Sequence, residues 1–204
     1  GNIARHIISF AFPLLLGNIF QQLYNTVDTW VVGNFASNEA YSAVGNVGPI
    51  VNMLIGFFMG LSSGAGVVIS QYYGAKNDEK VHNAVHTAIA LTVIMTALFT
   101  FIGITMAPFM LRLMKTPANV MPQSTAYLQT YFSGIMGLML YNMGAGILRA
   151  VGDSKRPFYF LVLSASLNIV LDLLFVLAFH MGVAGVAYAT ILSQGISALL
   201  VLFV

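Results

Sequence analysis

Residues 13–35 read PLLLGNIFQQLYNTVDTWVVGNF, an apolar run long enough to cross a bilayer as a helix. A hydrocarbon core about 30 Å thick requires roughly 20 residues at the helical rise. Polar side chains recur in this run at intervals of one helical turn or less: Asn18, Gln21, Gln22, Asn25 and Asp28. Because this spacing places them on one side of a helix, the segment predicts a membrane helix with a polar face.

The composition of the whole chain supports a membrane protein. Of its 204 residues, 58% are hydrophobic and 7% are charged, whereas a soluble domain carries about 25% charged residues. The net charge of +2 is small and scattered, which excludes a nucleic-acid partner. The absence of cysteine excludes disulfides and thiolate metal sites.

Apolar runs separated by charged, Gly-rich or Pro-containing breaks predict an all-α integral membrane protein. The six expected transmembrane helices cover residues 7–33, 46–73, 83–111, 121–148, 157–179 and 183–204. All eight basic residues fall in breaks or at ends, and a cytoplasmic N-terminus would leave only Arg112 and Lys115 outside. The positive-inside rule therefore predicts a multi-pass protein of the cell (plasma or inner) membrane with its N-terminus in the cytoplasm.

Two acidic residues, Asp28 and Asp172, fall inside apolar helices, while the other four lie in the breaks. A charge at the bilayer centre costs about 2.5 to 3.5 kcal/mol on insertion scales, so such residues face a protein interior or an aqueous cavity. Further polar rows occur in the fifth and sixth helices: Ser164, Asn168 and Asp172, then Thr190, Ser193, Gln194 and Ser197. We expect the three rows to converge.

Two interpretations of these polar residues remain open. Asn, Gln, Ser and Thr can act as interhelical hydrogen-bonding residues, worth about 0.6 kcal/mol per pair, but that role does not require an ionisable group. Asp, Asn and Thr also offer the hard oxygen ligands that suit a small cation such as Na⁺. A carboxyl group in a low-dielectric site can instead carry a proton near neutral pH. The cation site and the protonated carboxyl group both describe the binding of a coupling ion, Na⁺ or H⁺.

Small residues and proline give two further expectations. Gly56, Gly60 and Gly64 lie at intervals of four, which predicts a bare helix face against which a neighbouring helix packs closely. Pro13 lies inside the first span, where it removes a backbone hydrogen bond and permits a kink.

Residues 13–35 resemble the first helix of the multidrug and toxic compound extrusion (MATE) transporters. Three further segments resemble that family in the family's order: GLSSGAGVVISQYYGAKN at 60–77, LRAVGDSKRPF at 148–158 and SLNIVLDLLF at 166–175. Ala150 stands where many members have Gly. The resemblance implies that residues 1–204 form the N-terminal six-helix lobe of a twelve-helix, two-lobe transporter, with the C-terminal lobe absent from this sequence.

The resemblance also implies a function. It implies no enzyme and no cofactor other than a coupling ion, but a secondary active antiporter that exports amphipathic, often cationic organic compounds in exchange for Na⁺ or H⁺. Its partners would be small organic substrates, the lipid bilayer and the missing lobe. The resemblance assigns coupling-ion ligands to Asp28, Asn168, Asp172 and Thr190, and helix bending to Pro13. From the polar rows themselves we expect a polar cavity lining of Gln21, Asn25, Ser164 and Gln194.

Other functions are weaker matches. A lipid-linked oligosaccharide flippase of the same superfamily would need a cationic cavity for pyrophosphate, and no Lys or Arg lies inside the spans. An intramembrane aspartyl protease would resemble its family around Tyr-Asp and Gly-x-Gly-Asp, whereas Asp28 lies in YNTVD and Asp172 in NIVLD.

Aromatic and Met side chains in the fourth span predict ordinary packing for most members, or an adaptable substrate wall: Tyr131, Phe132, Met136, Met139, Tyr141 and Met143.

Overall fold

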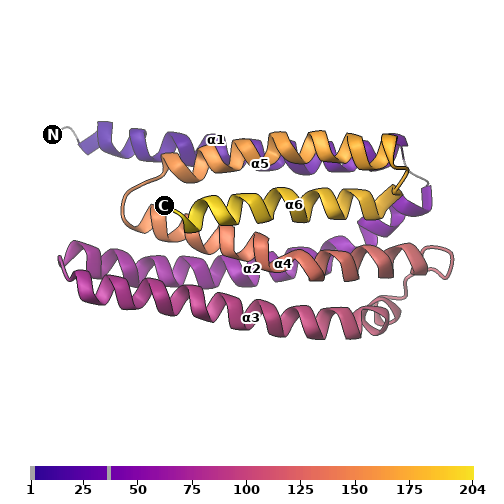
Figure 1. The fold of residues 1–204 in the computed structure, drawn as a ribbon, viewed down its shortest axis with the longest axis horizontal. Helices are drawn as coiled ribbons and strands as arrows, with labels where there is room; N and C mark the ends of the chain where they lie inside the picture. Colours follow the sequence, from indigo (N-terminus) through magenta and orange to yellow (C-terminus); the bar gives the residue numbers. More distant parts are fainter. Residues whose placement is uncertain (1–2, 36–37) are drawn as a thin grey trace.

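The computed structural model describes the backbone of residues 3–35 and 38–204. Side chains are described for these residues apart from Ile3, His6, Asn18, Gln21, Tyr24, Asn25, Asp28, Val32, Phe35, Asn38, Glu39, Ala40 and Val183. The described chain is a bundle of long helices (Figure 1). In chain order these are α1 (Ile3–Phe35), α2 (Asn38–Gly74), α3 (Asp78–Leu113), α4 (Met121–Ala150), α5 (Lys155–Leu173), the π-helix η1 (Leu174–Ala178) and α6 (Gly182–Leu202).

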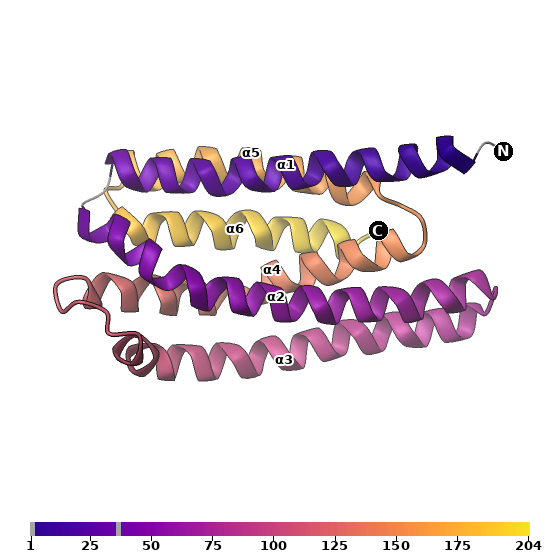
Figure 2. The ribbon, with the colours of Figure 1, turned by 180° about the vertical axis from the view of Figure 1, so that it is seen from behind.

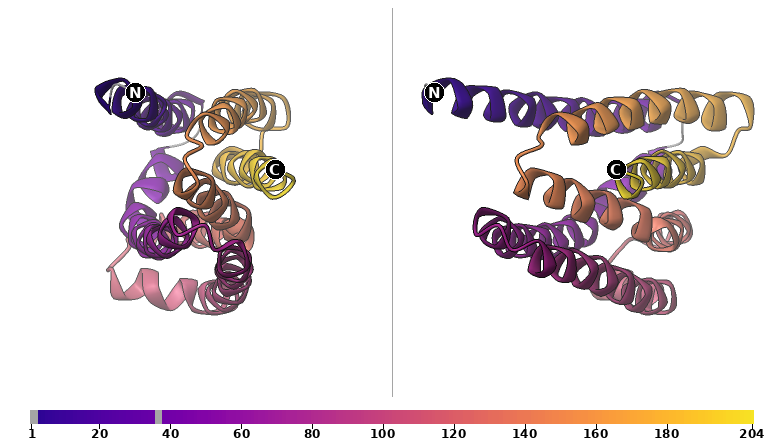
Figure 3. Two further views of the ribbon diagram at one scale, coloured as in Figure 1. Left: turned by 90° about the vertical axis from the view of Figure 1, so that its left-hand side faces the viewer. Right: turned by 60° about the vertical axis from the view of Figure 1, so that its left-hand side comes forward.

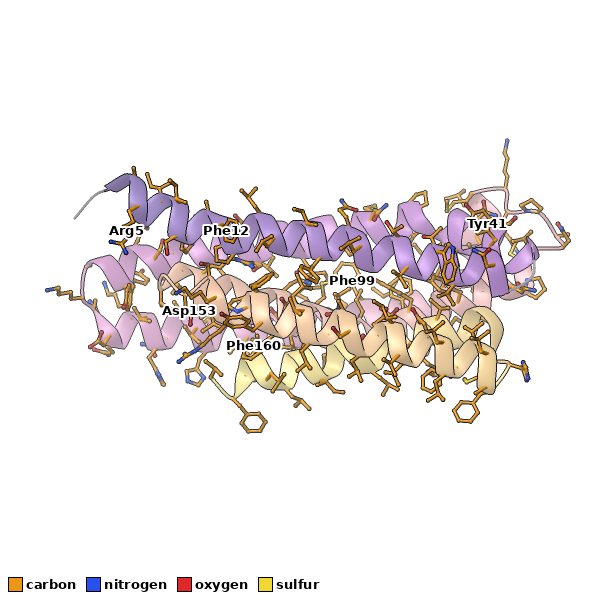
Figure 4. All side chains as sticks on the ribbon, turned by 90° about the horizontal axis from the view of Figure 1, so that it is seen from above. Arg5, Phe12, Tyr41, Phe99, Asp153 and Phe160 are labelled. Carbon is orange, nitrogen blue, oxygen red and sulfur yellow. The ribbon has the colours of Figure 1, made fainter. Side chains whose placement is uncertain are left out.

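The helices alternate in direction, so the connections gather at two ends of the bundle (Figures 1 and 2). The N-terminus, the α2–α3 turn, the α4–α5 connection and the C-terminus lie at one end; Figure 4 shows Arg5 and Asp153 there and Tyr41 at the other. Six basic residues therefore share one end, and Arg112 and Lys115 lie at the other. The predicted charge asymmetry is confirmed, while the side of the membrane that each end faces stays a prediction.

Five helices of the described chain are long and apolar enough to cross a membrane. They are Tyr41–Gly74, Asp78–Leu113, Met121–Ala150, Lys155–Ala178 and Ala184–Leu202, and the described side chains of α1 add a shorter apolar stretch, Ile7–Gly17. Helices α2 and α3 extend beyond the predicted spans, because hydropathy marks only the apolar part of a helix. The polar start of α3 is instead stabilised by Asn77, whose side-chain oxygen accepts a hydrogen bond from the Lys80 N–H at 3.1 Å.

Helices α4 and α6 lie in the middle of the bundle, with α1 and α5 on one side and α2 and α3 on the other (Figure 3). The main core joins α2, α3 and α4. It contains Val47, Ile50, Leu54, Phe58, Ala107, Leu111, Leu128, Phe132, Ile135 and Met139. Of the six aromatic and Met residues that the sequence analysis named in α4, five are buried and Met136 is half-buried, which confirms the packing interpretation for most of them.

The glycine row of α2 does not pack against another helix of the described chain, so that prediction is wrong within this lobe. A Cβ atom added at Gly56, Gly60 or Gly64 would meet nothing within 4 Å. Helix α4 approaches a different face, where the Ser62 hydroxyl donates to the Asn142 carbonyl at 3.0 Å. Two residues turn a helix by about 200°, so the contact face through Ser62 points away from the glycine row.

Candidate cation site

The polar row of α5 is buried. Ser164, Asn168 and Asp172 are 1%, 0% and 0% exposed, respectively, although other positions of the same helix expose large apolar side chains. Their spacing of four residues places them on one face, and that face points into the bundle. The sequence prediction that Asp172 avoids lipid is confirmed.

Helix α6 brings its own polar row against α5. Ser193, Gln194 and Ser197 are buried, and the Ser197 hydroxyl donates to the Phe160 carbonyl at 3.2 Å. Because α5 and α6 run in opposite directions (Figure 1), this contact sets their register. Ser164, one turn after Phe160, lies level with Ser193, one turn before Ser197. The polar rows of α5 and α6 therefore meet.

An apolar cluster of Val31, Val176 and Val186 marks where α1, η1 and α6 come together. Asp172 lies one turn before Val176, and Thr190 lies one turn after Val186. Since α5 and α6 are antiparallel, both residues lie on the same side of the valine cluster. Thr190 is half-buried there, and its hydroxyl donates to the Val186 carbonyl at 3.0 Å.

Helix α1 runs parallel to α5 and packs beside it (Figures 1 and 3). A Cβ at Gly17 would lie 3.6 Å from Leu161, and position 28 follows Gly17 by the same eleven residues that separate Leu161 from position 172. On parallel helices of equal rise, positions 28 and 172 are therefore level. The side chains of Gln21, Asn25 and Asp28 lie outside the described residues, so their contribution to the site stays a prediction.

The chemistry of the described site is that of neutral oxygens and one carboxylate. The Ser164 hydroxyl oxygen and the Gln194 side-chain oxygen are buried without a hydrogen-bond partner among the described residues. Buried polar groups are normally satisfied, so unpaired oxygens suit a water molecule or an ion. All basic residues of the chain lie at helix ends or in connections, so neither Lys nor Arg balances the charge of Asp172 from within the spans.

The π-helix Leu174–Ala178 begins two residues after Asp172 and was not predicted. The LLFVLA segment contains neither Gly nor Pro, so the local sequence carries no signal for it. A Cβ at Gly185 would lie 3.0 Å from the Cβ of Phe175, which shows that α6 approaches this widened turn closely. Such π-helical turns occur frequently at functional sites. The sequence analysis also made no prediction for Pro49 and Pro108, which lie inside α2 and α3, respectively.

The sequence model of the MatE family matches residues 13–174. This chain belongs to the MatE family. Members of this family are transporters rather than enzymes. The MatE chain is 36% identical over 203 residues to "Probable multidrug resistance protein YpnP" of Bacillus subtilis strain 168, covering 100% of this chain and 46% of that protein.

Solved structures agree with the fold. This MatE chain matches MATE in the bent conformation and MATE in the straight conformation, each with a TM-score of 0.92 and 29% sequence identity. Each match covers 100% of this chain and 45% of the solved chain. The chain thus spans about half the length of the relatives it matches, and its all-α membrane fold corresponds to one lobe of a two-lobe transporter.

Proposed function

We propose that this chain is the N-terminal lobe of a cation-coupled antiporter, and that Asp172 with Asn168, Thr190 and Asp28 binds the coupling ion, Na⁺ or H⁺. The observation that carries the proposal is the complete burial of Asp172 in a row of polar residues between helices. Burying a carboxylate is costly unless a cation or proton accompanies it. The hard oxygen atoms of Asp, Asn and Thr suit either ion.

Coupling requires that the ion binds two global states with different affinity, because equal binding shifts no equilibrium. In our proposal the ion favours the state that has released its substrate, and it lowers the affinity for substrate. Linkage is reciprocal, so substrate binding weakens ion binding by the same factor. A cation gradient thereby drives export.

Helix α1 is the proposed moving element. Pro13 lies inside it and removes one backbone hydrogen bond, so bending there costs less than elsewhere in the helix. The match to MATE in both a bent and a straight conformation supports a conformational change in this family. Because positions 28 and 172 are level, a bend in α1 would alter the distance between the two acids. Gln21, Asn25, Ser164 and Gln194 would line the polar cavity beside them.

The proposed substrates are small amphipathic, often cationic organic compounds. The relative from Bacillus subtilis is named for multidrug resistance, which supports this substrate class. We further propose that a second, C-terminal lobe completes the substrate cavity and that the N-terminus is cytoplasmic in the cell membrane, as the charge asymmetry indicates. The flippase alternative has no comparable support, since all basic residues lie at helix ends or in connections.

The test uses Trp30, which is two residues from Asp28 and 54% exposed in this chain. In the complete transporter, with any tryptophan outside residues 1–204 replaced by Phe, its fluorescence is titrated with NaCl against choline chloride. We expect a saturable response that Asp172→Asn abolishes and that Asp153→Asn, in the α4–α5 connection, leaves intact. If sodium produces no response, proton release on substrate binding should appear and should be lost in Asp172→Asn. Retention of either response in Asp172→Asn would contradict the site.

A further inference from the structure

A groove runs between α2 and α3 near the end of the bundle that carries most of the basic residues. Its volume is about 570 Å³. Its lining includes both small side chains and larger apolar ones: Gly64, Ala84, Ala88, Leu61, Val68 and Leu91. The open Gly64 position of the α2 glycine row lies in this groove, so the bare helix face has a shaped cavity beside it.

The chemistry of the groove changes along its length. The end near the α2–α3 turn is lined by Tyr72 and Lys80, and the opposite end by Leu61 and Leu91. The Lys80 ammonium nitrogen lies 5.4 Å from the centre of the Tyr72 ring, a cation–π contact that holds it at this end. Among the described residues lining the groove, Lys80 alone is charged, and neither Asp78 nor Glu79 forms an ion pair with it.

Among the five helices of the described chain that are long and apolar enough to cross a membrane, α2 and α3 are the least buried. The most apolar 18-residue segments of α3 and α2 are 17% and 22% buried, against 56% for α4. Both helices lie at the outer edge of the bundle (Figures 1 and 2), and their apolar surface has to meet lipid or another protein segment. The groove therefore opens on a face that lipid or another protein segment has to cover.

The dimensions match one leaflet of a bilayer. Lys80 and Leu91 are eleven residues apart on α3, which corresponds to about 16 Å along a helix. Half of a hydrocarbon core is about 15 Å thick. A phosphate placed at Lys80, at the polar end of α3, would leave a lipid chain lying along the apolar part of the groove.

We propose that this groove is a binding site for an anionic phospholipid, whose phosphate contacts Lys80 and one of whose acyl chains lies along Gly64 and Ala88. The apolar lining and the single unpaired lysine at the membrane-edge end complement the two parts of such a lipid. A zwitterionic lipid carries its own cation beside the phosphate and gains less from Lys80. This site is separate from the proposed cation site and does not depend on the proposed function.

Two substitutions in the complete transporter test the site. Gly64→Leu fills the groove, and because a Cβ there meets nothing within 4 Å, we expect the change to leave the helix backbones in place. Gly48→Leu is the matched control, since its Cβ position is also open and lies sixteen residues away on α2. Lys80→Gln removes the cation, and Lys155→Gln removes an exposed cation from the same end of the bundle outside the groove.

Native mass spectrometry of the purified transporter, titrated with dioleoyl phosphatidylglycerol or dioleoyl phosphatidylcholine, measures the binding. We expect tighter binding of phosphatidylglycerol, at least tenfold weaker binding in Gly64→Leu, about fivefold weaker binding in Lys80→Gln, and no change in either control. Equal affinity of wild type and Gly64→Leu would overturn the site and would indicate that another part of the transporter covers the groove. Equal losses in Lys80→Gln and Lys155→Gln would overturn the assignment of Lys80.

Discussion

Replacing Asp172 with Asn is expected to abolish gradient-driven export by the complete transporter. The carboxylate is fully buried between polar rows, and Asn keeps its size while removing its charge and its ability to carry a proton. A unit charge 4 Å from a cation contributes about 4 kcal/mol at an effective dielectric of 20, which corresponds to a loss of cation affinity on the order of a thousandfold. Efflux of a fluorescent organic cation from proteoliposomes, driven by an imposed Na⁺ or H⁺ gradient, measures the effect.

The matched control is Asp153→Asn. The Asp153 carboxylate accepts hydrogen bonds from the N–H groups of Lys155 and Arg156 at 3.0 and 3.1 Å, at the start of α5. Asp153 is also an aspartate, but it lies outside the membrane spans, so we expect Asp153→Asn to retain export. Gradient-driven export by Asp172→Asn at the wild-type rate would refute the ion-site assignment. Substrate binding by Asp172→Asn should survive, because the substitution removes the drive rather than the cavity.

Replacing Gly137 with Leu is expected to prevent stable folding. Gly137 of α4 faces α6 so closely that a Cβ atom would lie 3.0 Å from the Gly195 Cα and 3.1 Å from its nitrogen. These neighbours are backbone atoms, which cannot rotate away as a side chain can. Overpacking typically costs 1–3 kcal/mol, and a four-carbon side chain directed at a backbone should exceed about 3 kcal/mol. The thermal unfolding temperature and the yield of monodisperse protein in detergent report the loss.

Gly48→Leu is again the appropriate control, because its Cβ would meet nothing within 4 Å. It repeats the same chemical change on a membrane helix without closing a helix–helix contact, and it should leave the unfolding temperature within a few degrees of wild type. If Gly137→Leu and Gly48→Leu behaved alike, the α4–α6 glycine contact would have no role in stability.

The membrane class, the helices and the buried α5 row follow from the sequence, because hydropathy and helical periodicity are local properties. The cost of placing Asp172 in lipid predicted its burial without knowledge of its neighbours, and the structure confirms it. The level placement of positions 28 and 172 required the tertiary structure. It depends on α1 and α5 lying parallel and side by side, although α2, α3 and α4 separate them in the sequence.

Only the tertiary structure decided which small residues form contacts. The sequence shows that Gly56, Gly60 and Gly64 leave a helix face bare, but approach by a neighbour depends on that neighbour's own surface. Helix α4 presents Gly146 to Gly66 and Gly137 to Gly195, so the close contacts form there and the α2 row stays open. The π-helix after Asp172 has the same origin, because its widened turn fits against Gly185 on another helix rather than following from its own residues.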